Sequence, residues 1–123
     1  MTGYIINIEE KTLANNYFRQ VLFTAKNSQL VLMALQPGEE IGMEVHPEHD
    51  QFFRFEQGEG RVIIDGKESM VKADWAVVVP AGAKHNVINT GKEVMKLYTI
   101  YSPPEHKDGT VHKTKAEAIQ GGH

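Results

Sequence analysis

The sequence predicts an all-β fold, an antiparallel barrel or jelly roll formed by one domain of 123 residues. Short runs rich in β-branched and aromatic residues recur along the chain, and turn residues interrupt them roughly every 8–12 residues. Helical segments do not alternate with these runs, which is unlike the pattern of a parallel α/β sheet. A chain of this length can bury one hydrophobic core but not two. Together these observations favour an antiparallel sheet that closes on itself.

The predicted strands number about eight or nine and begin at residue 19. The runs expected to form them cover residues 19–25, 29–36, 41–46, 51–57, 61–65, 68–72, 75–79, 85–89 and 93–102. Before them, residues 9–18 are polar with scattered apolar positions, a pattern that fits a helical turn or an arm. After them, residues 113–119 form the one good helix-forming segment. We therefore expect a barrel core over 19–102 and a tail with a short helix over 103–123.

One of these runs predicts a strand that is buried on both faces. Residues 75–79 (WAVVV) are almost continuously apolar, as in strands covered on both sides. We expect Trp75 in the core, with its N–H group hydrogen-bonded.

Composition limits the classes of function. The net charge of −3 and the pI near 6.0 do not form the basic footprint of a nucleic-acid-binding protein. No apolar run approaches the length of a membrane span, and the first residues lack the pattern of a signal peptide. The absence of cysteine excludes disulfides and thiolate ligands and fits the cytoplasm. We expect a cytoplasmic protein whose partner is a small molecule rather than nucleic acid or a membrane.

Four side chains with nitrogen or oxygen donors are expected to hold one divalent metal. Glu44 and His46 stand two positions apart, so on a strand they point to the same face. A tight turn over 47–50 can bring Gln51 back beside them on a paired strand, and His85 is a fourth donor further along the chain. A carboxylate that faces inward needs a cation, because an unpaired buried charge is very costly. Two imidazoles and one carboxylate suit divalent iron and related metals.

Two points about these ligands stay open. Gln51 either binds the metal directly or hydrogen-bonds to a group that does. His49 and Asp50 follow His46 in the turn, and His49 would replace Glu44 if the register of the hairpin slipped. His49 is also a candidate catalytic residue, because imidazole transfers protons near neutral pH. The alternative for His49 is a solvated turn.

Apolar side chains beside the metal are expected to line a substrate pocket. Phe53 and Phe55 share the face of Gln51 by strand alternation. Tyr98 is a further candidate for this lining. Packing of the core alone would also place Phe53 and Phe55 inside the barrel, whether or not they contact a substrate.

The segment 102–112 contains two prolines, which favour an extended path that can cross the mouth of the barrel. His106 or His112 would then lie near the metal as a proton carrier. A disordered chain end is the alternative.

Two sequence motifs strongly resemble those of the cupin family. The first motif of that family is usually Gly-x5-His-x-His-x4-Glu-x6-Gly, and the second is Gly-x5-Pro-x-Gly-x2-His-x3-Asn. The positions that correspond to the first motif are Gly38, Glu44, His46, Gln51 and Gly58, without a gap. Those that correspond to the second are Asp74, Pro80, Gly82, His85 and Asn89. The departures are Glu44 for histidine, Gln51 for glutamate and Asp74 for glycine.

The resemblance implies a double-stranded β-helix that binds Mn, Fe, Ni or Zn. Some cupins that linearise unsaturated uronates are similar in having glutamine at the position of the glutamate. The resemblance therefore favours a metal-dependent isomerase or ring-opening enzyme acting on a sugar or uronate. An iron-dependent dioxygenase and a non-catalytic small-molecule sensor are the alternatives. Small cupins commonly form homodimers, and an N-terminal segment can add to the sheet edge of a neighbour.

Overall fold

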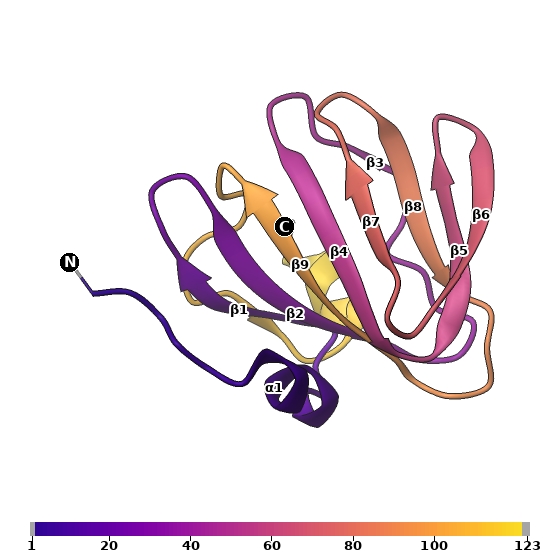
Figure 1. Ribbon diagram of the computed structural model, residues 1–123, viewed down its shortest axis with the longest axis horizontal. Helices are drawn as coiled ribbons and strands as arrows, with labels where there is room; N and C mark the ends of the chain where they lie inside the picture. The colour runs from indigo at the N-terminus through magenta and orange to yellow at the C-terminus, as the bar shows by residue number, and fades with distance from the viewer. Residues whose placement is uncertain (1, 122–123) are drawn as a thin grey trace.

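Two antiparallel sheets face one another around the hydrophobic core (Figure 1), which confirms the expected all-β jelly roll. A computed structural model describes residues 2–121. Its strands are β1 (Arg19–Thr24), β2 (Gln29–Leu35), β3 (Glu44–Val45), β4 (Asp50–Gln57), β5 (Glu59–Ile64), β6 (Lys67–Lys72), β7 (Ala76–Val79), β8 (Lys84–Asn89), β9 (Met95–Ser102) and β10 (Val111–His112). One sheet has the strand order β10-β1-β2-β9-β4-β7, and the other has the order β3-β8-β5-β6.

Two short helices flank the strands. Helix α1 (Ile8–Ala14) begins after Asn7, whose side chain accepts a hydrogen bond from the Glu10 amide at 3.0 Å. Helix α2 (Lys115–Gln120) begins after Thr114, which caps the Glu117 amide. It lies within the segment in which the sequence predicts a helix. With 7 and 6 residues, neither helix of the described chain is long enough to cross a bilayer.

Strand alternation decides which side chains fill the interior. On β4, Phe53 and Phe55 are fully buried, and their cross-strand partners on β9 are Thr99 and Leu97, which are buried as well. The two phenylalanine rings stack with their centroids 6.5 Å apart. The prediction that Phe53 and Phe55 face inward with Gln51 is therefore confirmed by the burial of all three.

Gly60 allows the strands of the smaller sheet to approach closely. A Cβ atom at Gly60 would lie 2.2 Å from the carbonyl oxygen of Ile88 on β8. Such a contact is sterically impossible, so any side chain would force β5 and β8 apart.

The expectation of a doubly buried strand over 75–79 is wrong. Strand β7 forms an edge of the larger sheet and pairs with β4. Val78 is 65% exposed and Trp75 is 48% exposed, whereas Val79 is buried. A continuous apolar run does not distinguish an edge strand with an uncovered outer face from a central strand, because both require apolar residues on their inner face.

Candidate metal centre

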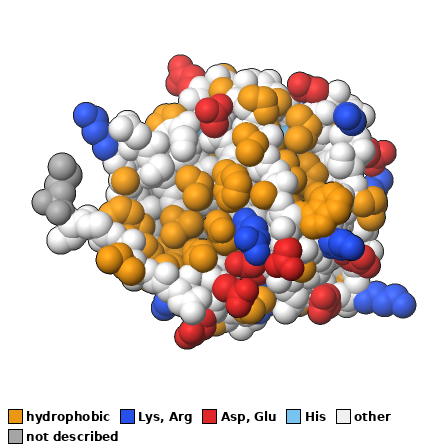
Figure 2. All heavy atoms as spheres, viewed as in Figure 1, with side chains coloured by type: hydrophobic (Ala, Val, Ile, Leu, Met, Phe, Trp, Pro, Cys, Tyr) orange, Lys and Arg blue, Asp and Glu red, His pale blue; other side chains and the backbone are white. Residues whose placement is uncertain are grey.

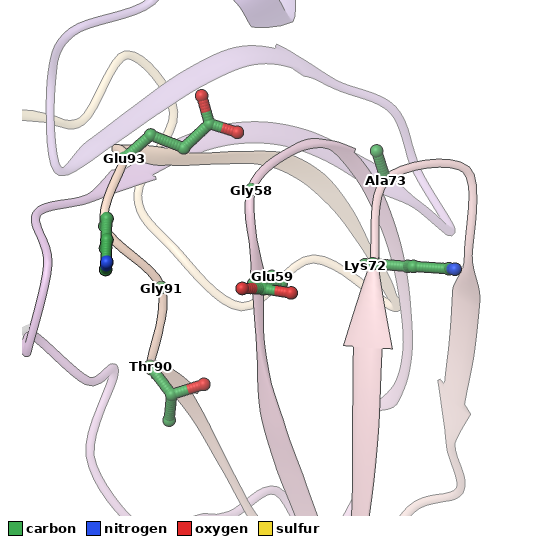
Figure 3. A pocket seen from close by; sticks show the side chains of 8 residues that line it. Gly58, Glu59, Lys72, Ala73, Thr90, Gly91 and Glu93 are labelled. Atoms are coloured by element: carbon green, nitrogen blue, oxygen red, sulfur yellow. The ribbon is translucent and has the colours of Figure 1, made fainter.

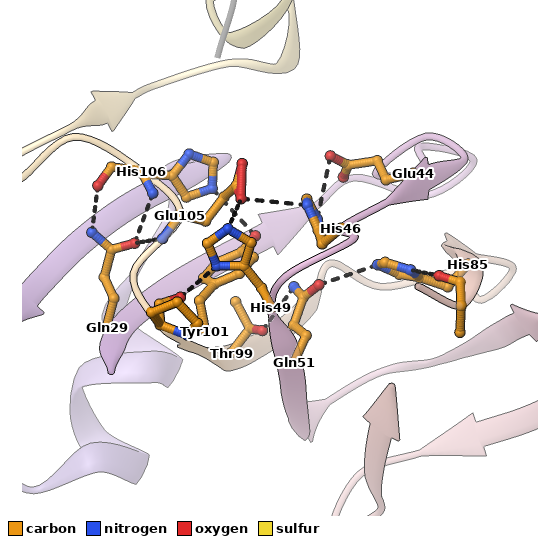
Figure 4. Close-up of polar contacts among 12 residues, drawn as sticks. Gln29, Glu44, His46, His49, Gln51, His85, Thr99, Tyr101, Glu105 and His106 are labelled. Atoms are coloured by element: carbon orange, nitrogen blue, oxygen red, sulfur yellow. Dashed lines mark hydrogen bonds and ion pairs between the residues drawn. The ribbon is translucent and has the colours of Figure 1, made fainter. Parts of the chain in front are cut away.

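The four candidate ligands meet at one end of the barrel, but not through the hairpin expected from the sequence. Glu44 on β3 is the direct cross-strand partner of His85 on β8, so these two side chains share a face. Gln51 lies on β4, which belongs to the other sheet. The expectation that the strand of Glu44 and His46 pairs with that of Gln51 is wrong, because the turn between them crosses from one sheet to the other. Figure 4 shows the four side chains approaching from these separate elements.

Hydrogen bonds from one loop to another hold this end of the barrel together. Gly82, in the loop before β8, donates its N–H to the carbonyl of His46 at 2.9 Å. Its φ of 88° lies in the left-handed region that glycine adopts readily. Asp50 accepts a hydrogen bond from the Ala81 amide at 2.9 Å. The turn that carries His46 is thereby tied to the loop that precedes His85.

His85 presents its Nε2 atom to Gln51. The Nδ1 atom of His85 lies 3.0 Å from the carbonyl oxygen of Ala83, which can only accept, so Nδ1 carries a proton. Nε2 lies 3.1 Å from the Oε1 atom of Gln51, whose amide group donates to the Thr99 hydroxyl at 3.0 Å. In the neutral ring Nε2 then carries no proton, so its lone pair and a lone pair of Gln51 Oε1 point at the same space. That is how two ligands of one cation are arranged.

His46 lies between two carboxylates. Its Nε2 atom is 3.7 Å from Glu44, and its Nδ1 atom is 3.5 Å from Glu105. Nε2 is buried and has no hydrogen-bond partner among the described residues. Burial lowers the pKa of His46, against the opposing influence of Glu44 and then of Glu105. A neutral imidazole with an unpartnered buried nitrogen is suited to metal binding.

The donor atoms fit a divalent metal, although the site is not closed around one. The rings of His46 and His85 have their centroids 5.4 Å apart. Neighbouring ligands that each lie about 2.1 Å from one metal are separated by about 3.0–3.5 Å, close to the Glu44–His46 and Gln51–His85 distances. Within residues 2–121, no three His, Asp or Glu side chains already form a metal-binding group.

The tail crosses this end of the barrel, as its prolines suggested. The Nε2 atom of His49 lies 3.1 Å from the Glu105 carboxylate, and its Nδ1 atom lies 2.6 Å from the carbonyl of Pro103. His49 therefore contacts the tail rather than the Glu44–His85 pair. The Nε2 atom of His106 lies 3.2 Å from the hydroxyl of Tyr101.

Tyr101 and Glu105 belong to this cluster, although sequence reasoning missed both. Tyr101 is 1% exposed, pairs with Gln51 across β4 and β9, and has its ring edge-on to His46. The alternation of side chains along β9 points Tyr101 inward once β9 is aligned with β4. Nothing in the sequence around Glu105 indicates that it reaches His46.

Tyr98 does not line the interior, so that expectation is wrong. Its cross-strand partner is Arg54, on the outer face, and its ring lies 6.3 Å from that of Phe52. The inward positions of β9 are the odd-numbered ones, Leu97, Thr99 and Tyr101, because their partners on β4 face inward.

A separate depression of about 580 Å³ lies at the opposite end of the barrel (Figure 3). Gly58, Glu59, Lys72 and Gly91 are among its lining residues. Gly58 follows the end of β4, whereas Gln51 lies near its start, so this depression is remote from the candidate ligands.

The fold and the site together define a cupin, and the chain belongs to the cupin family: the family's cupin-domain model matches residues 31–101. YrkC from Bacillus subtilis is 50% identical, over 94% of this chain and 66% of YrkC, so the chain spans just under two thirds of that relative. L612 of Acanthamoeba polyphaga mimivirus is 42% identical, over 97% of this chain and 77% of its own.

Solved structures agree with this assignment. The crystal structure of BH2720 from Bacillus halodurans is 45% identical and superposes with a TM-score of 0.95, over 97% of this chain and 95% of its own. A predicted oxalate decarboxylase from Thermotoga maritima, at 24% identity, shares the fold, with a TM-score of 0.61 over 64% of this chain and 69% of its own.

Proposed function

We propose that the protein is a metal-dependent enzyme that acts on a small oxygenated molecule. Glu44, His46, Gln51 and His85 would hold one Mn, Fe, Ni or Zn ion. The observation that carries the proposal is the arrangement of two histidine nitrogens. The Nε2 atom of His46 is buried without a hydrogen-bond partner among the described residues, and the Nε2 atom of His85 faces a carbonyl oxygen.

The side chains around these ligands supply the remaining functions of an active site. A bound divalent metal would polarise a carbonyl or hydroxyl oxygen as a Lewis acid. Burial raises the pKa of Tyr101, so its hydroxyl stays protonated and can donate to a substrate oxygen. His49 and Glu105 form a contact at the mouth that can hold or transfer a proton. The apolar ring of Phe53, whose centroid is 6.2 Å from that of His85, would exclude water from the core side of the proposed metal site.

We favour isomerisation or ring-opening of a sugar or uronate as the reaction. Such substrates carry neighbouring oxygens and require a proton to move between carbons or oxygens. The candidate site combines oxygen-binding ligands with a histidine–carboxylate contact suited to that step. The set of two histidines and one carboxylate would also support oxygen chemistry at iron, which is the second candidate. The third is a non-catalytic binding module with the same ligands.

Metal content tests the proposal most directly. Protein purified without a histidine tag should contain close to one equivalent of a transition metal, or take it up after chelation. Metal at about 100 times its Kd should stabilise the fold by about 2.7 kcal/mol. If the protein contains no metal, and Mn, Fe, Ni and Zn change neither melting temperature nor activity, the proposal is wrong. Conversion of a panel of sugars and uronates, followed by NMR, separates an isomerase from an oxygen-consuming enzyme and from a binding module.

We also propose that the protein forms a homodimer through the outer face of the larger sheet near β7. Figure 2 shows apolar side chains gathered on the visible face of the molecule. Val78 on β7 is 65% exposed, and Trp75, just before β7, is 48% exposed. Met70, which is 58% exposed, lies on β6 of the smaller sheet. In the N-terminal arm, Tyr4 stacks on Phe23 of β1, whereas Ile5 is 97% exposed. An uncovered strand edge beside an apolar surface favours association with a second copy.

A further inference from the structure

The tail forms a strap across the mouth of the barrel, and it is anchored on both sides. We define the strap as residues 103–110, which connect β9 to β10. Strand β10 pairs with β1, so the chain returns to the larger sheet after crossing the mouth. The strap lies outside both cupin motifs, the second of which ends at Asn89.

A buried side chain anchors the middle of the strap. Gln29 is 1% exposed, and its Oε1 atom accepts hydrogen bonds from the amides of Glu105 at 3.2 Å and His106 at 2.9 Å. Its amide group donates to the carbonyl of His106 at 2.7 Å and to the Thr24 hydroxyl at 3.0 Å. One carboxamide thus satisfies three backbone groups of the strap. Opening the strap would leave buried polar atoms without partners, which is costly.

This anchor places the Glu105 carboxylate between two histidine rings. Its Oε2 atom lies 3.1 Å from Nε2 of His49 and 3.5 Å from Nδ1 of His46, and its side chain is 28% exposed. Figure 4 shows the carboxylate above both rings, on the side of His46 that faces away from Glu44.

We propose that Glu105 is a positioning residue for His46, and that the strap thereby completes the metal site. This inference rests on the proposed metal-binding function. His46 can offer Nε2 to a metal only when its proton is on Nδ1, and Glu105 is the carboxylate beside Nδ1. Glu44 competes, because its carboxylate lies beside Nε2 at 3.7 Å and favours a proton there. Glu105 holds the proton on the side away from the metal.

Histidine tautomers measured by ¹⁵N NMR test this role without metal. In the metal-free protein at a pH where His46 is neutral, its proton should lie on Nδ1. In Glu105→Ala the proton should move to Nε2, beside Glu44. Glu105→Gln keeps an oxygen acceptor and should restore the Nδ1 tautomer in part. The matched control is Asp108→Ala, which removes a carboxylate from the same strap and should leave the tautomer unchanged.

Zn²⁺ titration by calorimetry on the same proteins provides the second measurement. Glu105→Ala should weaken binding by about 10–100-fold, and Glu105→Gln by less. Asp108→Ala should bind like the wild type, and circular dichroism should show that all variants are folded. Gln29→Ala should weaken binding in the same direction, because it releases the strap with Glu105 intact.

The possible outcomes separate this inference from the proposed function. If the wild type binds Zn²⁺ and Glu105→Ala binds it equally well, only the role of Glu105 is wrong. A loss of affinity with an unchanged tautomer would make Glu105 a direct ligand and would also overturn the positioning role. If the wild type binds no metal, both the proposed function and this inference fail.

Discussion

The Nε2 atom of His85 lies 3.1 Å from the Oε1 atom of Gln51, and this contact joins the two sheets at the mouth of the barrel. His85 belongs to the smaller sheet and Gln51 to the larger one, so the contact depends on how the sheets pack. The side-chain amide of Gln51 is held in turn by Thr99, and Nδ1 of His85 by Ala83. Nε2 of His85 and Oε1 of Gln51 are therefore oriented before a metal binds, which reduces the entropic cost of ordering these side chains.

Removal of single ligands should separate the four candidates. We expect Glu44→Ala, His46→Ala and His85→Ala each to abolish retention of metal through gel filtration. Gln51→Ala should only weaken retention, because an amide oxygen is a neutral ligand. His112→Ala, at a histidine on β10, should retain metal and serves as the control. If His49→Ala removes the metal while Glu44→Ala does not, the ligand assignment is wrong.

Tyr101 should make stability depend on alkaline pH. Burial raises its pKa above the ordinary value of about 10, so at higher pH the unfolded state releases a proton that the folded state keeps. The free energy of unfolding should therefore fall as the pH rises above about 10, by at most about 1.4 kcal/mol per pH unit. Urea unfolding between pH 9 and 11 measures this slope.

The slope should become shallower in Tyr101→Phe and remain unchanged in Tyr98→Phe, whose ring lies on the outer face. An equal slope in the wild type and in Tyr101→Phe would show that other groups cause the pH dependence.

Gln29→Ala should loosen the strap without unfolding the barrel. The change removes the partner of three backbone groups and should cost about 1–3 kcal/mol. Hydrogen exchange should show faster exchange at the amides of Glu105 and His106 than in the wild type. Gln36→Ala, at an exposed position after β2, is the control and should leave both amides protected. Unchanged protection in Gln29→Ala would mean that other contacts hold the strap.

Val78→Arg should disrupt the proposed dimer. The residue is 65% exposed on the β7 edge, so a charge there leaves the monomer folded but prevents apolar packing between copies. Light scattering coupled to gel filtration should show a shift from dimer to monomer. Ile119→Arg on α2, at a similarly exposed position, should not change the mass. A wild-type protein that is monomeric at all concentrations would refute the dimer.

Much of the fold could be predicted from the sequence because β-structure leaves a local pattern. The alternation on β4 places Gln51, Phe53 and Phe55 on one face in any arrangement of the sheets. The apolar run of β7 was misleading because the composition of a strand does not reveal whether its faces and edges are covered by other elements. Tyr98 was misplaced because the face of a β9 residue depends on its alignment with β4, which a single sequence does not show.

The amino-acid sequence by itself determined the all-β class, the family motifs and the candidate ligands Glu44, His46, Gln51 and His85, since strand periodicity and motif spacing are properties of the linear chain. Only the tertiary structure decided that Glu44 pairs with His85, that Gln51 approaches from the opposite sheet, and that Gln29 brings Glu105 to His46. These contacts join residues far apart in the chain. Their geometry follows from how the sheets pack and how the tail returns to β1, and no local pattern encodes either.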